Sequence, residues 1–464
     1  MKRIILPIFL VCISFVAFAQ SSLRLPAIIS NHAVLQQSTD VKLWGWAPST
    51  SPVKISCSWN PTDTVFTTPA KDWTWITSVK TPKSGGPYTI TFISDKQKIV
   101  IDDILIGEVW MCTGQSNMEF NFTWGVKDAG DAVAKSANNA IRFFQVARQY
   151  NNFPQTDCQG EWKISSPKTV ENMSVIGYFF GKKINSMTKA PVGLLASYWG
   201  GTCVQSWTPG EVFNKDTELK NDADNLTPVS WAPVAPSVLY NSMIYPIINY
   251  RIAGAIWYQG EGNTEQPQVY GKLFEGMIKG WREKMQSELP FYFVQIAPWN
   301  GYGGLSGALL REQQETALAQ PKTGMVVVGD LVDDLTNIHP KIKQEVGNRL
   351  ANMVLREQYG FTALQPYFPH FAKLSIQKNK ANITVASIGK LSCKEKSIKS
   401  FQLAGNDKIF YPATAMVEKN GSITLTSKMV KIPVAVRYCF TNDGVPNLFD
   451  VNGLPLIPFR TDKW

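Results

Sequence analysis

The sequence predicts an α/β domain with an all-β region on either side of it. Two observations predict this class. Between residues 104 and 360, apolar runs of strand length alternate with longer segments of helical period. On both sides of that range, short runs of alternating or β-branched residues are separated by Pro, Ser and Gly. Alternating strands and helices favour a parallel, doubly wound sheet, and 464 residues allow two or three domains.

The first 19 residues are predicted to be a secretory signal peptide. They consist of the basic start Met-Lys-Arg, an apolar run at residues 4–18, and the small residues Ala17 and Ala19 before Gln20. An apolar run of about 15 residues is short for a membrane span, and no later run approaches spanning length. We therefore expect an exported protein, periplasmic or extracellular, with no membrane span in its mature form.

The charge, the cysteines and the motifs argue against several functional classes. The formal net charge of +10 is spread along the chain, which favours a solvated surface over nucleic-acid binding. The cysteines beyond the signal peptide lack metal-ligand spacing, although an exported protein could pair some of them. Neither a Gly-x-Gly-x-x-Gly motif nor a Walker loop is present. We therefore expect no metal site and no cofactor.

Residues 20–103 are expected to form a small β-sandwich. The segments 41–46, 53–57 and 88–92 alternate or are rich in β-branched residues, and turn-forming residues separate them. A second β region is expected over residues 361–464, with strands at 373–376, 382–387, 423–426 and 434–440. Whether this second region folds alone or joins the N-terminal strands is left open.

Residues 104–360 carry the α/β pattern. Strands are expected at residues 104–111, 141–146, 192–197, 253–258, 291–296 and 325–328. Helices are expected at residues 175–187, 268–284, 308–319 and 341–359. The proline-rich segment 208–236 is predicted to be a long surface loop at the rim of a substrate site.

Ser116 is the candidate nucleophile. The apolar run 104–111 ends shortly before Gly114, and Ser116 follows in a polar turn, which is where open α/β sheets place reactive groups. The alternative is that Ser116 only caps the next helix. The Gly-x-Ser-x-Gly motif of many esterases is absent, because Met118 occupies the place of the second glycine.

A serine nucleophile needs a base, and His339 is the candidate. The chain has three histidines, and His32 lies in the N-terminal β region while His370 has aromatic neighbours in the sequence. His339 follows the last expected strand by a loop and precedes Pro340, so it can reach a serine at the same sheet edge. The alternative, a capping or surface histidine, is set aside mainly by elimination.

Hydrogen-bond donors for a developing oxyanion are expected after two other strands. Gly200 and Gly201 follow residues 192–197, and glycine allows a backbone N–H to approach a reacting carbonyl closely. Asn263 follows residues 253–258 and offers a side-chain amide. Both segments could equally be ordinary turns.

These segments together resemble the signature blocks of the SGNH hydrolases. The blocks are Gly-Gln-Ser-Asn-Met at 114–118, Gly-Gly-Thr at 200–202, Trp-Tyr-Gln-Gly-Glu at 257–261 with Asn263, and Ile-His-Pro at 338–340. The residues in these blocks are similar to those of sialate O-acetylesterases and related secreted carbohydrate acetylesterases. The resemblance extends over nearly the whole mature chain. The resemblance implies Ser116 as nucleophile and His339 as base. It also implies an oxyanion hole formed by the Ser116 N–H, a Gly200 or Gly201 N–H, and Asn263.

One position departs from the pattern. Many SGNH hydrolases have an aspartate three residues before the histidine, and this chain has Thr336 there. Asp333 or Asp334 could orient the imidazole, or the site could work as a serine–histidine dyad, which is the arrangement we favour. Gln115 and Glu261 are expected to brace the site through hydrogen bonds.

The sequence thus predicts a secreted, metal-independent serine esterase that removes O-acetyl groups from sugars. The leading substrate is 9-O-acetylated sialic acid, and acetylated xylan or another acetylated glycan is the alternative. A carbohydrate-binding protein on an inactive esterase scaffold is the non-enzymatic alternative, and 15 tryptophans fit such a surface. Intact Ser116, His339 and Asn263 argue against it.

Overall fold

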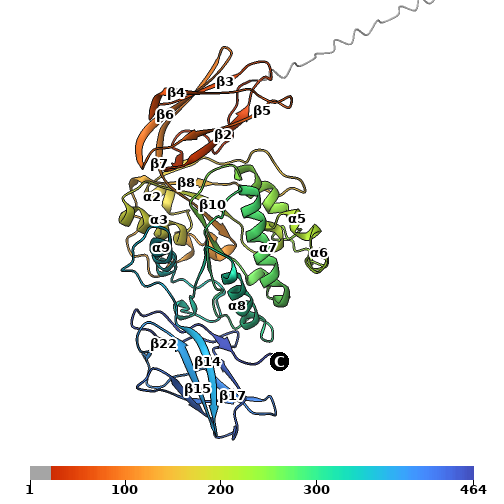
Figure 1. Ribbon diagram of the computed structural model, residues 1–464, viewed down its shortest axis with the longest axis vertical. Coiled ribbons are helices and arrows are strands. Elements are labelled where there is room, and N and C mark those ends of the chain that lie inside the picture. The colour runs from red at the N-terminus through yellow and green to blue at the C-terminus, as the bar shows by residue number, and fades with distance from the viewer. Residues whose placement is uncertain (1–21) are drawn as a thin grey trace, which may run out of the picture.

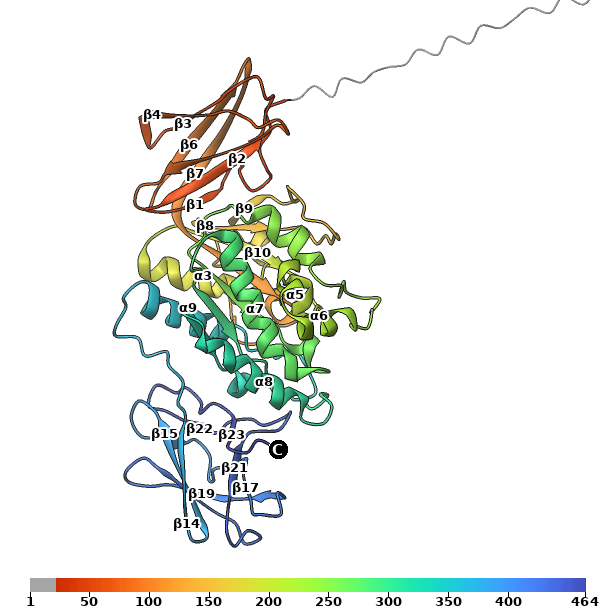
Figure 2. The same cartoon turned by 45° about the vertical axis from the view of Figure 1, so that its right-hand side comes forward.

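The computed structural model describes residues 22–464. Three regions follow one another along its longest axis: an N-terminal β region, a central α/β region and a C-terminal β region (Figures 1 and 2). The predicted signal peptide, residues 1–19, lies outside the described residues. None of the helices within residues 22–464 is both long and apolar enough to cross a membrane.

The central sheet has the strand order β13-β12-β11-β7-β10-β8-β9. Its parallel strands are β7 (Gln97–Gly114), β8 (Asn138–Gln145), β10 (Val192–Tyr198), β11 (Gly254–Tyr258), β12 (Phe291–Val294) and β13 (Thr323–Val326). The prediction of a parallel sheet was wrong at one edge, where β9 (Trp162–Ser165) pairs antiparallel with β8. That strand is only four residues long and contains Lys163, so it lacks the apolar run by which the others were predicted.

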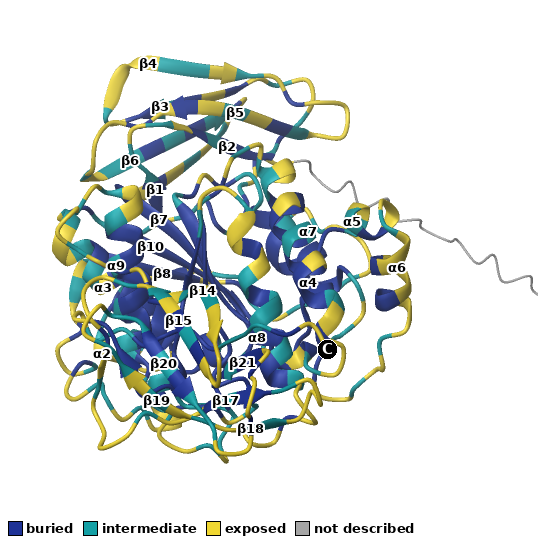
Figure 3. Ribbon diagram, turned by 60° about the horizontal axis from the view of Figure 1, so that its bottom comes forward, coloured by how far each residue is buried: buried dark blue, intermediate teal, exposed yellow. Residues whose placement is uncertain are grey.

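Helices cover both faces of this sheet (Figures 1 and 2). The helices α3 (Val175–Thr188) and α9 (Gln344–Gln358) pack together on one face, and α7 (Pro267–Met285) and α8 (Ser306–Thr316) pack together on the other. Every residue of β10, β11 and β12 is consequently buried, as Figure 3 shows for the sheet interior. Short helices complete the region: α1 (Ser116–Glu119), α2 (Pro167–Val170), α4 (Val204–Trp207), α5 (Gly210–Asn214) and α6 (Thr217–Asp224).

The 18-residue strand β7 belongs to two sheets. Its first part pairs antiparallel with β6 (Gly85–Ser94), and its last part lies between β10 and β11. The predicted boundary after residue 103 therefore falls inside a continuous strand. The extension toward Gln97 was missed because exposed and buried residues alternate there, unlike in the apolar run that follows.

The N-terminal region has two layers. One contains β1 (Val34–Gln36), β3 (Val53–Cys57), β4 (Asn60–Thr67), β6 and the start of β7. The other is the pair β2 (Asp40–Trp46) and β5 (Thr74–Lys80). The ring of Trp75 on β5 lies 5.9 Å from that of Phe92 on β6, so aromatic side chains fill the space between the layers.

The C-terminal region forms its own sheets and core. One sheet has the order β14-β15-β20-β19 and another the order β18-β17-β21-β23. The bounds are β14 (His370–Gln377), β15 (Lys380–Ala386), β16 (Ser392–Cys393), β17 (Phe401–Ala404), β18 (Phe410–Pro412), β19 (Thr414–Val417), β20 (Ile423–Thr426), β21 (Ala435–Tyr438), β22 (Leu448–Phe449) and β23 (Phe459–Arg460). The region lies at the opposite end of the molecule from the N-terminal strands, so the described part of the chain has two separate β regions (Figure 1).

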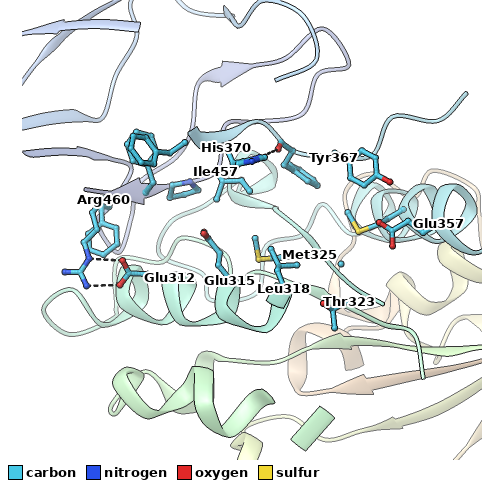
Figure 4. Close-up of a pocket in the computed structure, with 17 residues that line it drawn as sticks. Glu312, Glu315, Leu318, Thr323, Met325, Glu357, Tyr367, His370, Ile457 and Arg460 are labelled. Atoms are coloured by element: carbon cyan, nitrogen blue, oxygen red, sulfur yellow. Dashed lines mark hydrogen bonds and ion pairs between the residues drawn. The ribbon is translucent and has the colours of Figure 1, made fainter. Parts of the chain in front are cut away.

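A hollow of about 460 Å³ lies at the seam between the central and C-terminal regions (Figure 4). Arg460 crosses the seam to form a two-pronged ion pair with Glu312 of α8, both N···O distances being 2.8 Å. The lining also includes Thr323 and Gly324, at the start of β13. The hollow therefore faces the amino-terminal end of β13, whereas the candidate catalytic residues follow the carboxyl ends of the strands.

Candidate active site

Gly114 ends β7 in a backbone conformation that favours glycine. Its φ is +132°, and a Cβ atom there would lie 2.2 Å from the carbonyl oxygen of Tyr258 on β11. The next residue, Gln115, donates its backbone N–H to that same oxygen at 3.0 Å. The chain turns sharply as a result, and Ser116 begins α1 at the carboxyl end of the sheet. The strand order reverses direction on either side of β7, so this is the switch point of the sheet.

Ser116 and His339 lie in hydrogen-bond contact. The distance between Ser116 Oγ and His339 Nε2 is 2.8 Å, within the range required of a nucleophile and its general base. The two residues are 223 positions apart in the sequence. The imidazole lies beside two aromatic rings, with centroid distances of 6.5 Å to Phe120 and 6.3 Å to Trp124. Both residues remain partly accessible, so a substrate can reach the pair.

The surroundings of His339 favour its neutral form. Burial lowers the pKa of His339, and the nearby positive charge of Lys343 lowers it further. A neutral imidazole that accepts the Ser116 proton at Nε2 carries its own proton on Nδ1. The site is thus set up for proton transfer from serine to histidine near neutral pH.

The structure does not bring Asp333 or Asp334 to the imidazole. Asp333 forms an ion pair with Lys127 at 2.6 Å and accepts a backbone hydrogen bond from Lys341. Asp334 accepts hydrogen bonds from the backbone and the hydroxyl of Thr336. Within residues 22–464, neither carboxylate is hydrogen-bonded to His339. The loop is held instead through the His339 N–H, which donates to Asn337 Oδ1 at 2.9 Å.

Asn117 connects three parts of the site, and the sequence reasoning did not assign it a role. Its amide nitrogen donates to Glu261 Oε1 at 2.6 Å and to the carbonyl of Ile338 at 3.1 Å. Its amide oxygen accepts from Lys343 Nζ at 2.6 Å. Asn117 is fully buried, so it ties the nucleophile turn directly to the loop that carries His339. Its place in the 114–118 block was the available signal.

Lys343 was also missed as a site residue. Its ammonium group is buried and lies 5.0 Å from the ring centroid of Phe120 and 5.4 Å from that of Tyr258, in cation–π contact. Burial lowers the pKa of Lys343 to about 7, although the nearby carboxylates of Glu261, Asp128 and Asp333 act in the opposite direction. The residue is therefore poised between its charged and neutral forms close to physiological pH.

Gln115 and Glu261 take part in the hydrogen bonds around this turn. Gln115 Oε1 accepts from the backbone N–H of Gly262 at 3.1 Å and of Gly260 at 3.4 Å. Glu261 accepts from Asn117 through Oε1, while its buried Oε2 has no partner within the described residues. Burial raises the pKa of Glu261, because water is excluded from its carboxylate.

The predicted oxyanion donors differ in whether their N–H groups already have hydrogen-bond partners. The N–H of Ser116 is the first of α1 and has no intrahelical partner. Gly200 lies against the nucleophile, since a Cβ added to it would be 3.2 Å from Ser116 Cβ. Its N–H, however, donates to Glu119 Oε2 at 2.9 Å. Glu119, which sequence reasoning missed, thus occupies a donor that an oxyanion would use.

Asn263 is held by its own neighbours. Its amide nitrogen donates to Gln205 Oε1 at 2.8 Å, and its oxygen accepts from Val204 N at 2.9 Å and Gln259 Nε2 at 2.7 Å. These bonds fix the orientation of the amide and use one of its two N–H groups. No hydrogen bond within residues 22–464 connects it to Ser116. Gly201, with φ of +77°, continues the turn away from the nucleophile toward the proline-rich loop.

Comparisons with known proteins find related carbohydrate esterases. A family model described as a carbohydrate esterase, sialic acid-specific acetylesterase, matches residues 106–356. Sialate O-acetylesterases of Homo sapiens and Pongo abelii are each 26% identical to the chain, with 94% of the chain and 92% of the relative covered. The crystal structure of a carbohydrate acetylesterase from Xanthomonas citri is 31% identical, with a TM-score of 0.87, and the match covers 95% of this chain and 100% of that one.

Proposed function

We infer the chemistry of this chain from the premise that it belongs to the family of sialic acid-specific carbohydrate acetylesterases. Membership confirms the resemblance on which the sequence prediction depended. The protein is a carboxylic ester hydrolase that acts on O-acetylated carbohydrates. Within that class we propose 9-O-acetylated sialic acid as the substrate. The relatives named sialate O-acetylesterases support a sialic acid ester.

The contact between Ser116 Oγ and His339 Nε2 at 2.8 Å carries the proposed mechanism. Ser116 attacks the acetyl carbonyl carbon while its proton moves to His339. The tetrahedral intermediate places its oxyanion toward the free N–H of Ser116, with Gly200, Gly201 and Asn263 as the further candidates. His339 then gives the proton to the departing sugar oxygen, which leaves an acetyl group on Ser116. His339 next takes a proton from water, whose oxygen attacks the acetyl carbonyl carbon. Collapse of this second intermediate breaks the bond to Ser116 Oγ and releases acetate, while His339 returns the proton to Ser116.

We propose that the site works as a dyad. The ion pair of Asp333 and the local turn of Asp334 support this, because each carboxylate already has its own partners. The backbone N–H of His339 is held instead by Asn337, and the imidazole lies beside the rings of Phe120 and Trp124. Loss of an orienting carboxylate lowers the rate of such sites without abolishing the chemistry.

Three further proposals concern the fold type, the domains and the export of the protein. We propose that the catalytic region is an SGNH-type domain, and its serine at the switch point of the sheet supports that assignment. We propose residues 20–103, 104–360 and 361–464 as the domains. Strand β7 crosses the first boundary and belongs to the sheets of both adjoining domains. We also propose export, which the composition of residues 1–19 supports.

Acetate release tests the proposed function. The enzyme should hydrolyse p-nitrophenyl acetate and 9-O-acetylated sialic acid, and Ser116→Ala should abolish both activities. Ser84→Ala is the matched control, because Ser84 is exposed in the N-terminal region far from the site. Faster hydrolysis of acetylated xylan than of acetylated sialic acid would replace the proposed substrate with a neutral glycan. Unchanged activity in Ser116→Ala would remove Ser116 as the nucleophile.

A further inference from the structure

A hollow of about 630 Å³ with aromatic walls lies beside the candidate active site. Four elements enclose it: the segment after β8, the end of β10, the end of α6, and the proline-rich loop that precedes the π-helical segment Tyr240–Ile244. All of these except α6 contribute one large aromatic side chain each, namely Tyr150, Trp199 and Trp231. Tyr150 is 64% exposed and Trp231 is 71% exposed, so two large rings face solvent where little covers them.

The hollow begins next to the turn that touches the nucleophile. Gly200 adjoins Ser116, and Gly201 follows it in the chain. A Cβ added to Gly201 would lie 3.0 Å from Cδ1 of Trp231, so the indole packs directly on this backbone. The adjacent residues Gly200 and Gly201 therefore link the Ser116 turn to the Trp231 ring.

The loop that carries Trp231 is anchored. The carbonyl of Pro233 accepts a hydrogen bond from the Ser206 hydroxyl at 3.1 Å, and the carbonyl of Val234 accepts one from the Cys203 thiol at 3.4 Å. Both donors stand at α4, which is buried. Pro228, Pro233 and Pro236 restrict the backbone further. The indole is thus exposed on a constrained segment, which lowers the entropy lost when a ligand orders it.

The charges around the hollow are already balanced. The guanidinium of Arg148 is paired with Glu119 and lies 5.4 Å from the ring centroid of Trp199. Asp224, which lines the hollow, is paired with Lys220 at 2.7 Å. Recognition here therefore relies on aromatic faces more than on an unpaired charge. Pyranose rings match such a surface, because their axial C–H groups form apolar faces that pack on aromatic rings.

We propose that this hollow is the subsite for the sugar body of the substrate, with Trp231 as the stacking platform beside the ester at Ser116. The inference rests on the proposed function, since it assigns the part of the site that holds the carbohydrate. It makes Trp231 a substrate-binding residue with no part in bond breaking. Its effect should consequently appear only for esters that carry a sugar.

The test compares sugar esters with a sugar-free ester on the full-length enzyme. Trp231→Ala should lower kcat/KM for 9-O-acetylated sialic acid and for acetylated xylan oligosaccharides by roughly tenfold, mainly through KM, as for loss of an aromatic anchor. Hydrolysis of p-nitrophenyl acetate should stay within about twofold of wild type, since no sugar is present. Trp231→Phe keeps an aromatic face and should recover most of the loss. Trp73→Ala, which removes an exposed tryptophan of the N-terminal region, is the matched control.

The kinetics of Trp231→Ala distinguish a failure of the proposed subsite from a failure of the proposed function. Unchanged kcat/KM for both sugar esters in Trp231→Ala would overturn the subsite while leaving the proposed function intact. An equal fall for the sugar esters and for p-nitrophenyl acetate would also overturn it, because Trp231 would then support the catalytic turn instead. A wild-type enzyme that hydrolyses p-nitrophenyl acetate but neither sugar ester would refute the proposed function, and the subsite with it.

Discussion

The ammonium of Lys343 opposes protonation of the His339 imidazole. Burial disfavours both positive charges, and Lys343 adds a repulsion that lowers the pKa of His339. The base is active when neutral, so a lowered pKa extends activity toward acidic pH. Because the pKa of Lys343 is about 7, its ammonium form is present over the range in which His339 titrates. Burial of the imidazole, with a smaller contribution from the charge of Lys343, thus favours the neutral form of His339.

Replacement of Lys343 by methionine should move the acidic limb of the pH–activity profile. Lys343→Met removes the charge, raises the pKa of His339, and shifts the acidic limb of the kcat/KM profile to higher pH. The measurement is the pH dependence of p-nitrophenyl acetate hydrolysis, which separates a shifted limb from a uniform loss of rate. Lys341→Met, at the partly exposed lysine two residues earlier, should leave the limb where it is. An acidic limb that stays in place in Lys343→Met would contradict the electrostatic account.

Asn117 should matter more than either aspartate of the histidine loop. Asn117→Ala leaves Lys343 and Glu261 without a shared partner and frees the Ile338 carbonyl, so the imidazole loses its position. We expect kcat to fall about a hundredfold, as for small misplacements of a catalytic group.

Asp333→Asn and Asp334→Asn should each change kcat less than about tenfold, because neither contacts His339. Single-turnover rates with p-nitrophenyl acetate measure the effect of all three substitutions. A loss of orders of magnitude in Asp334→Asn would refute the dyad.

At the scale of elements, the turn after β7 depends on Gly114. Gly114→Ala forces a Cβ to within 2.2 Å of the Tyr258 carbonyl at a positive φ, which must push β7 and β11 apart or move Ser116. We expect a loss of about 2 kcal/mol or more in stability and a large loss of activity. Gly303→Ala is the control, because a Cβ there meets nothing within 4 Å. Urea denaturation and acetate release measure the two effects, and wild-type values for Gly114→Ala would exclude the strain.

The strands and long helices were predictable because each carries its own local signal. Apolar runs marked β10, β11 and β12, which are buried along their whole length, and helical periodicity marked α3, α7 and α9. The short strand β9 and the polar start of β7 lack such a signal. The polar network of the site could not be predicted in the same way. The motif block 114–118 contained Asn117, but the hydrogen bond of Asn117 with Lys343 joins residues 226 positions apart.

At the scale of the whole molecule, the described chain has two hydrophobic cores. One core runs from the N-terminal layers through the central sheet, and the other lies within the C-terminal region. The first is continuous because β7 crosses from one sheet into the next. We therefore expect the N-terminal and central regions to unfold together and the C-terminal region to unfold as a separate unit.

Calorimetry with two matched variants tests this division. Leu350 and Leu403 are fully buried in the first and second core, respectively. Leu350→Ala should lower the midpoint temperature of the transition at which esterase activity disappears, and Leu403→Ala should lower the midpoint temperature of the other transition. Each substitution should reduce the free energy of unfolding of its own region by about 2–5 kcal/mol. A single transition that both variants lower equally would show that the seam between the regions couples them completely.

The double membership of β7 also limits how the chain length can vary. Residues of a strand advance about 3.3 Å each and alternate between faces, so one inserted residue inverts every side chain that follows it. An insertion within Gln97–Gly114 must therefore break the pairing with one of the two sheets or displace Ser116. The exposed turn around Gly303, in contrast, can lengthen at little cost. We expect insertions and deletions among related chains to accumulate in such turns and to be absent from β7, whose residue count fixes the spacing between the N-terminal sheet and the nucleophile.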